Sequence, residues 1–518
     1  MTRTRPANAD EIVARLLPLV RASSGKTATV MSPLDGNQVC EMTISNEHDV
    51  DQAFAHARHE FTTWSKTPLS QRVAIIDRYH DLVLNNSELL LDIAQWENGK
   101  TRGNAADEMI DIALTCRYYA RTARKSLKPQ RRRGAFPLAT VTREHHLPLG
   151  VIGVISPWNY PLTLAVSDFI PALLAGNTVV TKPDLQTPLS ALILIDLLFQ
   201  AGLPRDAVQV VMGEGVDVGP LITDRADFVM FTGSTRVGRE VARRAGERLI
   251  DSSMELGGKN SLVVGRNVNL DDAVATAVRG AFANSGQLCI GTERIVVHSD
   301  LYASFMEKFR VAVANMKVGS EIGWGYDMGT LINERQIATT ERHIADAVSR
   351  GAVLEVGGNR LPEVGPFAFA PTVLSNVPAE AEVCSNETFG PVCAVYTWRT
   401  DEDLVAFVNN TEYGLSAGIV SRDIAWANKI ANQLKVGAVN INEAFGSAYA
   451  SIDAPMGGMG QSGLGRRHGL HGILKYTAAQ TVARQRFMKL TPQWNLDDRG
   501  WATFAIRAIR ILKVLRFK

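Results

Sequence analysis

A cysteine in the second half of the chain is the first candidate for covalent chemistry. Cys289 lies in the segment FANSGQLCIGTER, where a helical pattern is broken by Gly286. A thiol becomes a nucleophile when its surroundings favour the thiolate, and a loop near a helix end can supply such a field. A cysteine taken by itself is more often a small buried hydrophobic residue. The residues that accompany Cys289 must therefore decide its role.

Two further segments carry polar residues in unusual surroundings. Glu255 stands in MELGGKN, between an expected strand and the pair Gly257 and Gly258, which is a poor position for a solvated surface charge. The two glycines permit close approach of a ligand to the backbone, although alone they would indicate only a tight turn. Asn159 in SPWNYP has a side-chain amide that can donate hydrogen bonds, and it could equally be a turn residue.

These segments occur in an order that resembles the aldehyde dehydrogenase superfamily. The matching segments span about residues 150–469 and are SPWNYP, TKPDLQTP, FTGSTRVG, MELGGKN, GQLC, ETFGPV and PMGGMGQSGLGRRHG. Such a series, in order and at appropriate separations, is far more specific than any one of its members. Within the superfamily the chain is most similar to the actinobacterial type of succinate-semialdehyde dehydrogenase.

The resemblance implies roles for three catalytic residues. Cys289 would attack an aldehyde carbonyl, and the side chain of Asn159 with the backbone N–H of Cys289 would stabilise the oxyanion. Hydride would then pass to a nicotinamide cofactor. Glu255 would activate the water that hydrolyses the thioester. Because related enzymes that transfer the acyl group to coenzyme A generally lack this glutamate, a free carboxylate is the expected product.

The resemblance also implies a site for NADP or NAD. Exposed amides at the start of the helix after FTGS suit a pyrophosphate, although the GxGxxG pattern is absent. The expected cofactor residues are Trp158 and Ser234 near the pyrophosphate, Lys182 at the adenosine ribose, Glu387 at the nicotinamide ribose, and Gly233, Leu256, Gly257 and Phe389. NAD-selective relatives often carry glutamate three residues after the lysine, where this chain has Leu185. NADP is therefore favoured and NAD tolerated, although Asp184 could oppose a 2′-phosphate.

The sequence leaves two classes of substrate open. A distal carboxylate calls for a cationic partner, yet the positions of the usual arginines are occupied by Ser167 and Ala283. Arg117 is the nearest substitute, and solvent is an equally good place for its side chain. The expected pocket residues are Tyr160, Leu162, Ser167, Arg117, Leu288, Ile290 and Phe445. The overall resemblance favours succinic semialdehyde, and the apolar lining favours an aromatic or medium-chain aliphatic aldehyde.

Composition and periodicity indicate an α/β protein with more than one domain. The 518 residues are 46% hydrophobic and 21% charged, which excludes disorder as the main state. Strand and helix patterns alternate after Gly150, as in parallel sheets covered by helices. We expect a Rossmann-like cofactor domain at 1–131 and 150–255, a second α/β catalytic domain mainly at 256–474, and a small β oligomerisation arm at 132–149 and 475–490.

The segments of this arm resemble the strands through which family members associate, and exposed strand edges invite pairing, so a homodimer or homotetramer is expected. Residues 491–518 form a basic amphipathic tail, with Phe504, Ala508, Ile511, Leu512 and Leu515 on one face. Such a tail can rest on an anionic membrane, or it can dock on its own protein or on a partner subunit.

Charge and cysteine usage limit the remaining classes of function. A net charge of +2 provides no general field for nucleic acid. The five cysteines are scattered and form no CxxC pair, which indicates a reducing cytoplasm and no zinc or other metal site. The longest uncharged run, residues 147–167, is interrupted by three prolines, so no integral membrane segment is expected.

Overall fold

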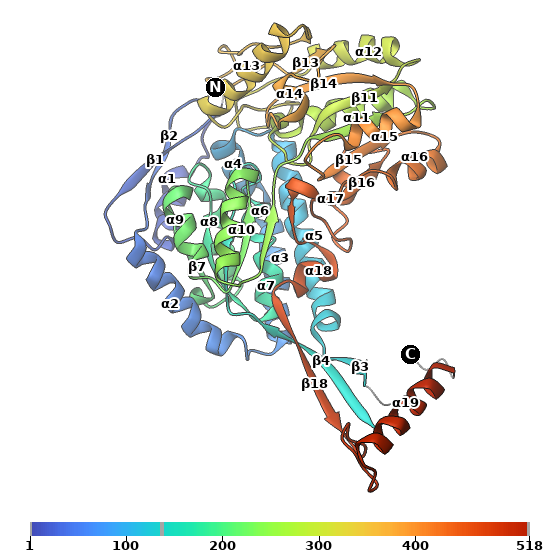
Figure 1. Ribbon diagram of the computed structural model, residues 1–518. Helices are drawn as coiled ribbons and strands as arrows, with labels where there is room; N and C mark the ends of the chain where they lie inside the picture. The colour runs from blue at the N-terminus through green and yellow to red at the C-terminus, as the bar shows by residue number, and fades with distance from the viewer. Residues whose placement is uncertain (1–2, 135–138, 515–518) are drawn as a thin grey trace.

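The computed structural model describes residues 3–134 and 139–514, and its body is built around two large sheets (Figure 1). The first is six-stranded, in the order β17-β9-β8-β5-β6-β7. Its strands are β5 (Val151–Ile155), β6 (Thr178–Lys182), β7 (Val208–Val210), β8 (Phe228–Thr232), β9 (Ser252–Glu255) and β17 (Gly463–Leu464). All neighbours are parallel except β17, which pairs antiparallel with β9.

Helices enclose this first sheet, so its strands are continuous apolar runs rather than alternating ones. Every residue of β5 and β6 is buried, as expected for a parallel sheet covered on both faces. The helices that follow its strands are α6 (Thr163–Val166), α7 (Phe169–Ala175), α8 (Pro188–Gln200), α9 (Gly215–Thr223) and α10 (Thr235–Glu247).

The N-terminal segment packs around the same sheet. It contains α1 (Ala9–Leu16), β1 (Thr27–Met31), β2 (Gln38–Thr43), α2 (Glu47–Trp64), α3 (Leu69–Asn85), α4 (Ser87–Asn98) and the long α5 (Arg102–Leu127). Glu97 at the end of α4 accepts hydrogen bonds from the backbone N–H groups of Leu189 and Ser190, and each of these bonds is 2.7 Å long. This carboxylate satisfies the free amides at the start of α8, which a helix end leaves unpaired.

The second sheet is seven-stranded, in the order β12-β13-β14-β11-β10-β15-β16. Its strands are β10 (Asn260–Val264), β11 (Thr292–His298), β12 (Val353–Val356), β13 (Thr372–Ser375), β14 (Val392–Trp398), β15 (Ser416–Val420) and β16 (Ala438–Ile441). Only the pair β12 and β13 is antiparallel among the described strands of this sheet. Its helices are α11 (Leu270–Phe282), α12 (Tyr302–Ala314), α13 (Glu334–Ser349), α14 (Glu382–Ser385), α15 (Asp401–Asn409), α16 (Ile424–Ala431) and α17 (Gly446–Tyr449). After it, α18 (Gly469–Leu474) returns to pack on α5 and α7.

A three-stranded sheet extends away from this body as an arm (Figure 1). It consists of β3 (Gln130–Arg133), β4 (Thr140–Pro148) and β18 (Thr477–Gln485), with β4 in the centre. Thr477 pairs with Pro148 and Gln485 with Thr140, so β18 is antiparallel to β4 along its whole length. The other edge of β18 has no strand beside it in the described chain, and its side chains are nearly all exposed.

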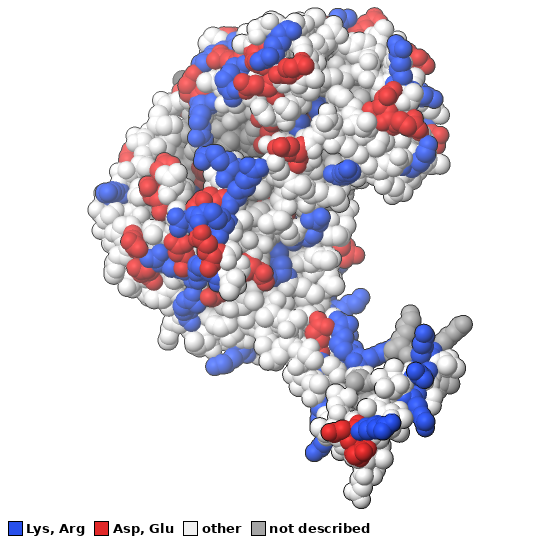
Figure 2. Space-filling view, in the orientation of Figure 1, with Lys and Arg blue, Asp and Glu red and all other residues white. Residues whose placement is uncertain are grey.

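The tail forms a helix, α19 (Asp498–Val514), at the far end of the arm (Figure 1). Trp501 is buried against the rings of Trp494 and Phe504. Other apolar side chains of the helix remain in solvent, including Ile511, which is 58% exposed. Basic residues gather on this part of the molecule (Figure 2). Leu515 of the predicted apolar face lies outside the described residues.

No helix in the described ranges is long and apolar enough to cross a membrane.

Candidate active site

The loop that follows β5 places Asn159 at the junction of the two sheets. The side-chain nitrogen of Asn159 donates to the backbone oxygen of Gln287 over 3.1 Å. Lys100 Nζ donates to the backbone oxygen of Asn159 over 2.8 Å, and Asn98 Nδ2 donates to that of Trp158 over 2.8 Å. The loop is thus held on one side by the end of α4 and the link between α4 and α5, and on the other by the turn of Cys289.

A buried ion pair stands behind this loop. Lys100 also pairs with Glu108, and both side chains are fully buried. Glu108 accepts from the backbone N–H groups of Leu162 and Thr163 over 2.8 and 3.1 Å. The pair therefore joins the beginning of α5 to both ends of the segment 159–163.

Cys289 lies in a turn between α11 and β11 whose backbone is tightly constrained. Asn284 and Ser285 have φ angles of 52° and 56°, and Asn284 Nδ2 donates to the backbone oxygens of Asn159 and Gln287 over 3.0 and 2.9 Å. A Cβ on Gly286 would lie 2.0 Å from the oxygen of Gly390, so only glycine fits there. The oxygen of Cys289 accepts from Asn260 Nδ2 over 2.7 Å. Asn159 therefore contacts the turn of Cys289 through Gln287 and Asn284.

The surroundings of Cys289 favour the neutral thiol. Burial and the carboxylates of Glu387 and Glu255 raise the pKa of Cys289 to about 12, and Arg467 opposes them only in part. The expected field in favour of the thiolate is therefore absent from this structure, because two acids face the sulfur. A base or a positive charge must accompany its ionisation.

Glu255 is the last residue of β9, and its backbone is fixed on both sides. Its oxygen accepts from the N–H of Gly233 over 3.0 Å, and the next N–H, that of Leu256, donates to Ser462 over 3.0 Å. The residue is 6% exposed, and its Oε1 has no hydrogen-bond partner among the described residues. Burial raises the pKa of Glu255 to about 7, with Arg467 and Lys475 acting in the opposite direction. A carboxyl that titrates near neutral pH suits a general base.

The glycines after Glu255 form a backbone cradle next to Glu387. A Cβ on Gly257 would lie 2.3 Å from Glu387 Oε2, and the N–H of Gly258 donates to Glu387 Oε1 over 2.9 Å. Burial and the charge of Glu293 raise the pKa of Glu387 to about 8. The absence of a side chain on Gly257 therefore lets the Glu387 carboxylate lie directly against this stretch of backbone.

The other predicted cofactor residues lie at the ends of strands in the first sheet or opposite them. Lys182 ends β6, is buried, and donates to the oxygen of Pro183 over 2.9 Å. Gly233 and Ser234 follow β8, and Ser234 precedes the first turn of α10. The ring of Trp158 meets that of Phe389 edge to face, with 5.6 Å between centroids. Leu185 is half-buried against the core of the first sheet.

Two residues that the sequence analysis missed hold the loop of Glu387. Glu293 accepts hydrogen bonds from the backbone N–H groups of Thr388 and Phe389, each 2.9 Å long. It also forms an ion pair with the buried Lys259. Lys259 follows Gly258 directly, and Glu293 lies four residues after Cys289. Their closeness in sequence to Gly258 and Cys289 was the one signal that could have identified them as residues of the site.

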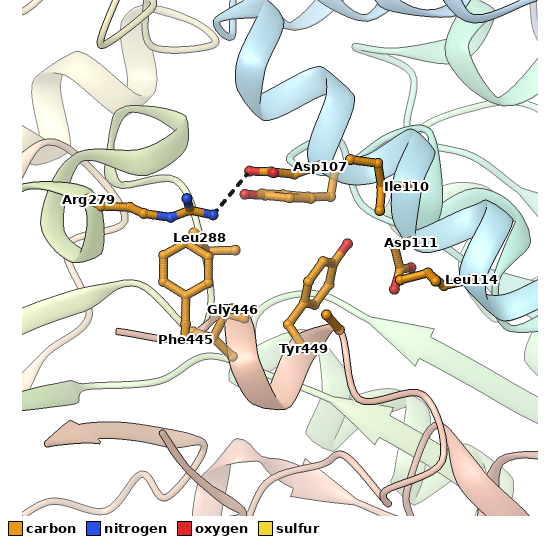
Figure 3. A pocket seen from close by; sticks show the side chains of 12 residues that line it. Asp107, Ile110, Asp111, Leu114, Arg279, Leu288, Phe445, Gly446 and Tyr449 are labelled. Carbon is orange, nitrogen blue, oxygen red and sulfur yellow. Dashed lines mark ion pairs between the residues drawn. The ribbon is translucent and has the colours of Figure 1, made fainter. Parts of the chain in front are cut away.

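A pocket of about 100 Å³ opens beside the turn of Cys289 (Figure 3). Both neighbours of Cys289, Leu288 and Ile290, line it. Its other walls are Asp107, Ile110, Asp111 and Leu114 of α5, Tyr160, Arg279 of α11, and Phe445, Gly446, Tyr449 and Ala450. The expected residues Tyr160, Leu288, Ile290 and Phe445 therefore come together in one cavity.

Three expected pocket residues lie elsewhere. Arg117 is exposed on α5 and is not in the lining, and Leu162 is buried in the core of the first sheet. Ser167 lies behind the wall, where its hydroxyl donates to Asp111 Oδ2 over 3.3 Å. Asp111 Oδ1 has no partner in the part of the chain that the structure describes, and burial raises the pKa of Asp111 to about 6.

Arg279 is the cationic residue of the pocket, and the sequence analysis missed it. Its side chain is 57% exposed and lies 3.9 Å from Asp107 Oδ2 (Figure 3). Glu443 Oε1 lies 3.8 Å from the same guanidinium group. Arg279 is four residues before Ala283, which occupies the position of one of the usual carboxylate-binding arginines. Residues four apart share one face of a helix, so the cation is displaced by one turn of α11.

The aldehyde dehydrogenase family profile matches residues 19–482. The chain belongs to the aldehyde dehydrogenase family. A relative from Mycobacterium tuberculosis (strain ATCC 25618 / H37Rv) is 44% identical over 513 residues, which are 98% of this chain and 99% of the relative. It is provisionally named as an NADP(+) succinate-semialdehyde dehydrogenase. The 3-sulfolactaldehyde dehydrogenase of Pseudomonas putida is 34% identical and covers 89% of this chain and 94% of its own.

Solved aldehyde dehydrogenases share the fold as well. A variant of the Bacillus cereus aldehyde dehydrogenase has a TM-score of 0.88 at 29% identity and covers 94% of this chain and all of its own. An NADP dependent enzyme from E. coli has a TM-score of 0.85 at 30% identity, with 90% and 96% covered. The predicted α/β fold and the predicted NAD(P)-dependent aldehyde dehydrogenase activity class are confirmed.

Proposed function

We propose that this aldehyde dehydrogenase oxidises succinic semialdehyde to succinate, with NADP favoured and NAD tolerated. The observation that carries the proposal is the position of Arg279 in the pocket beside Cys289. Relatives provide support, because those at 44% identity are named for this aldehyde and for NADP(+). The Pseudomonas relative is named for another aldehyde whose far end is an anion.

Arg279 is suited to hold the far carboxylate of the substrate. Its distances to Asp107 and Glu443 exceed the length of a hydrogen bond, so neither acid occupies its donors. A guanidinium binds a carboxylate through two parallel hydrogen bonds. Leu288 and Ile290 of the same wall flank the nucleophile, so an anchored carboxylate directs the aldehyde toward Cys289.

The chemistry proceeds in two stages at Cys289. Its sulfur gives up a proton and bonds to the aldehyde carbon, while Asn159 Nδ2 and the N–H of Cys289 stabilise the resulting oxyanion. When bound, an oxidised nicotinamide would supply the acceptor for the hydride that leaves this carbon as the oxyanion collapses to a thioester. Glu255 then takes a proton from water, the water oxygen bonds to the thioester carbon, and the carbon–sulfur bond breaks to release the carboxylate.

Seven residues, five from the first sheet and its loops and two from the segment that precedes β14 of the second sheet, would hold the cofactor. We assign the pyrophosphate to Gly233, Ser234 and Trp158, the adenosine ribose to Lys182, and the nicotinamide ribose to Glu387, with Gly257 and Phe389 beside the ring. The close approach of the Glu387 carboxylate to Gly257, which a side chain on Gly257 would prevent, supports this assignment. Leu185 offers no carboxylate to repel a 2′-phosphate, and this absence supports NADP.

The test compares succinic semialdehyde, hexanal and benzaldehyde with both cofactors, in the wild type and in Arg279→Gln. We expect the variant to lose about tenfold or more in kcat/KM for succinic semialdehyde, mainly through KM, and little for hexanal; tenfold corresponds to about 1.4 kcal/mol of binding. Arg117→Gln is the matched control, because Arg117 is exposed on α5 outside the pocket. Equal losses for all three aldehydes would contradict a carboxylate site at Arg279.

The apolar walls of the pocket favour a second candidate, an aromatic or medium-chain aliphatic aldehyde. Five of the twelve lining residues are large and apolar, namely Ile110, Leu114, Leu288, Ile290 and Phe445. A higher kcat/KM for hexanal or benzaldehyde than for succinic semialdehyde in the same panel would select this candidate.

Cys289→Ala tests the covalent step directly. We expect aldehyde oxidation to be abolished while cofactor binding persists, because the assigned cofactor contacts lie on other residues. Fluorescence titration with NADP and a turnover assay provide the two measurements. Turnover that persists in this variant would remove Cys289 from the mechanism.

We further propose a cytoplasmic homodimer or homotetramer formed through the arm. The unpaired edge of β18 supports the assembly, since exposed edges recruit further strands. All five cysteines are free thiols, which supports a reducing compartment.

A further inference from the structure

Three charged residues next to Glu255 are buried and take no part in the steps assigned above. They are Asp168, which precedes α7, Arg467, which follows β17, and Lys475, which follows α18. We propose that this cluster sets the ionisation of Glu255, so that Arg467 and Lys475 are positioning residues for the general base. The inference rests on the proposed role of Glu255 in hydrolysis.

The cluster is a closed arrangement of two cations and one acid. Arg467 Nη2 lies 3.2 Å from Asp168 Oδ2, and Lys475 Nζ lies 3.4 Å from Asp168 Oδ1. The three side chains are 7%, 11% and 5% exposed in the order Arg467, Lys475 and Asp168. Because two buried cations share one carboxylate, a further negative charge close by is favoured.

The fold brings this cluster to the strand of Glu255. β17 pairs with β9 so that Gly463 lies opposite Glu255, and Arg467 follows three residues after the end of β17. Lys475 Nζ also lies 3.4 Å from the hydroxyl of Ser253, two residues before Glu255. A Cβ on Gly457 would lie 3.2 Å from Glu255 Oε1 and 3.0 Å from Arg466 Cδ. The segment from Gly457 to Arg467 therefore encloses the carboxyl group.

Glu255 depends on these charges because its Oε1 receives no hydrogen bond within the described ranges. Arg467 has the largest lowering effect on the pKa of Glu255, followed by Lys475, while Asp168 raises it and Arg466 lowers it. Cys289 and Tyr476 also face the Glu255 charge, and burial keeps both neutral by raising their pKa values. Asp111 interacts with Arg467 from the direction of the substrate pocket.

Removing a cation and removing the acid from the cluster should move the pH profile of hydrolysis in opposite directions. Arg467→Met removes a cation, so the acid limb of the pH profile for thioester hydrolysis should move to higher pH by about one unit. Asp168→Asn frees both cations, so the same limb should move to lower pH. Single-turnover kinetics between pH 5 and 9, about two units to either side of neutrality, isolate the hydrolysis step.

Two further variants keep the test decisive. Lys475→Met should move the limb in the same direction as Arg467→Met, and Arg467→Lys should restore most of the wild-type position. Arg225→Met is the matched control, because Arg225 pairs with Asp51 and Glu47 at the surface. A purely structural role would lower the yield or the melting temperature of the variants without moving the limb.

Glu255→Gln separates this inference from the proposed function. If Glu255→Gln retains the acid limb, the role of Glu255 itself is wrong. If Glu255→Gln loses the limb while the Arg467, Lys475 and Asp168 variants leave it in place, Glu255 remains the base and the inference about the cluster is overturned.

Discussion

Lys100 Nζ donates to the backbone oxygen of Asn159 over 2.8 Å and lies 4.2 Å from the centre of the Tyr160 ring. One buried ammonium thus touches the residue assigned to the oxyanion and the aromatic wall of the substrate pocket. Its charge is balanced by Glu108, whose other contacts are backbone amides of the same loop. The catalytic loop is consequently fixed by an ion pair that never meets the substrate.

Lys100→Met should reduce both stability and turnover, because it leaves Glu108 buried without a counter-charge. Breaking a buried pair in this way costs about 3–5 kcal/mol. Urea denaturation measures the loss, and kcat reports the displaced loop. Lys100→Met combined with Glu108→Gln should lose less stability than Lys100→Met alone. Lys66→Met, at an exposed lysine, is the control; a similar loss there would refute the explanation.

Glu255→Gln should slow thioester hydrolysis by about a hundredfold or more while hydride transfer stays fast. Rapid mixing should show a burst of reduced cofactor followed by slow turnover. Because burial raises the pKa of Glu255 to about 7, wild-type hydrolysis should rise with pH through neutrality as the carboxylate forms. Equal slowing of both phases would count against this residue as the base.

Leu185→Glu should shift cofactor preference toward NAD. The new carboxylate would accept a hydrogen bond from the ribose 2′-hydroxyl of NAD and repel the phosphate of NADP, for a change of about tenfold or 1.4 kcal/mol. The ratio of kcat/KM values for the two cofactors is the measurement. Leu185→Gln, of similar size but uncharged, separates charge from packing, since Leu185 is half-buried. An unchanged ratio would mean that this side chain does not face the ribose.

The arm should assemble subunits into a dimer or a dimer of dimers. Val482 lies in the middle of β18 and is 49% exposed, so Val482→Lys places a charge on the expected interface. Light scattering at micromolar concentration should show an oligomer for the wild type and a larger fraction of smaller species for the variant. A wild-type monomer under these conditions would contradict the prediction.

The fold could be predicted, and candidates for the reactive residues could be located, because both leave local signals in the sequence. Continuous apolar strands such as β5 and β6 indicate a covered parallel sheet, and Cys289 and Glu255 stand in short segments of distinctive composition. The domain boundaries and the roles of the site residues remain predictions, because neither the distances in the structure nor the similarity to other proteins tests them.

The substrate pocket could not be predicted in the same way, because its walls come from distant segments. Arg117 and Arg279 are both helical arginines in the sequence, and only packing shows that the first points to solvent and the second to the cavity. Leu162 and Ser167 follow Asn159 closely, yet the turns of α6 carry them behind the wall. Lys100 and Glu108 gave no signal at all, since apart from each other their side chains bond to backbone atoms 50 or more residues away.

Glu255 belongs to the six-stranded sheet, whereas Cys289 belongs to the turn that enters the seven-stranded one. A chain severed between them would yield two polypeptides, one with the proposed proton acceptor and the other with the proposed nucleophile. Neither piece alone could complete a turnover, and recovery of dehydrogenase activity on mixing would report reassembly of the halves. The enzyme is thus a natural scaffold for a complementation reporter, in which catalysis itself signals that two partners have met.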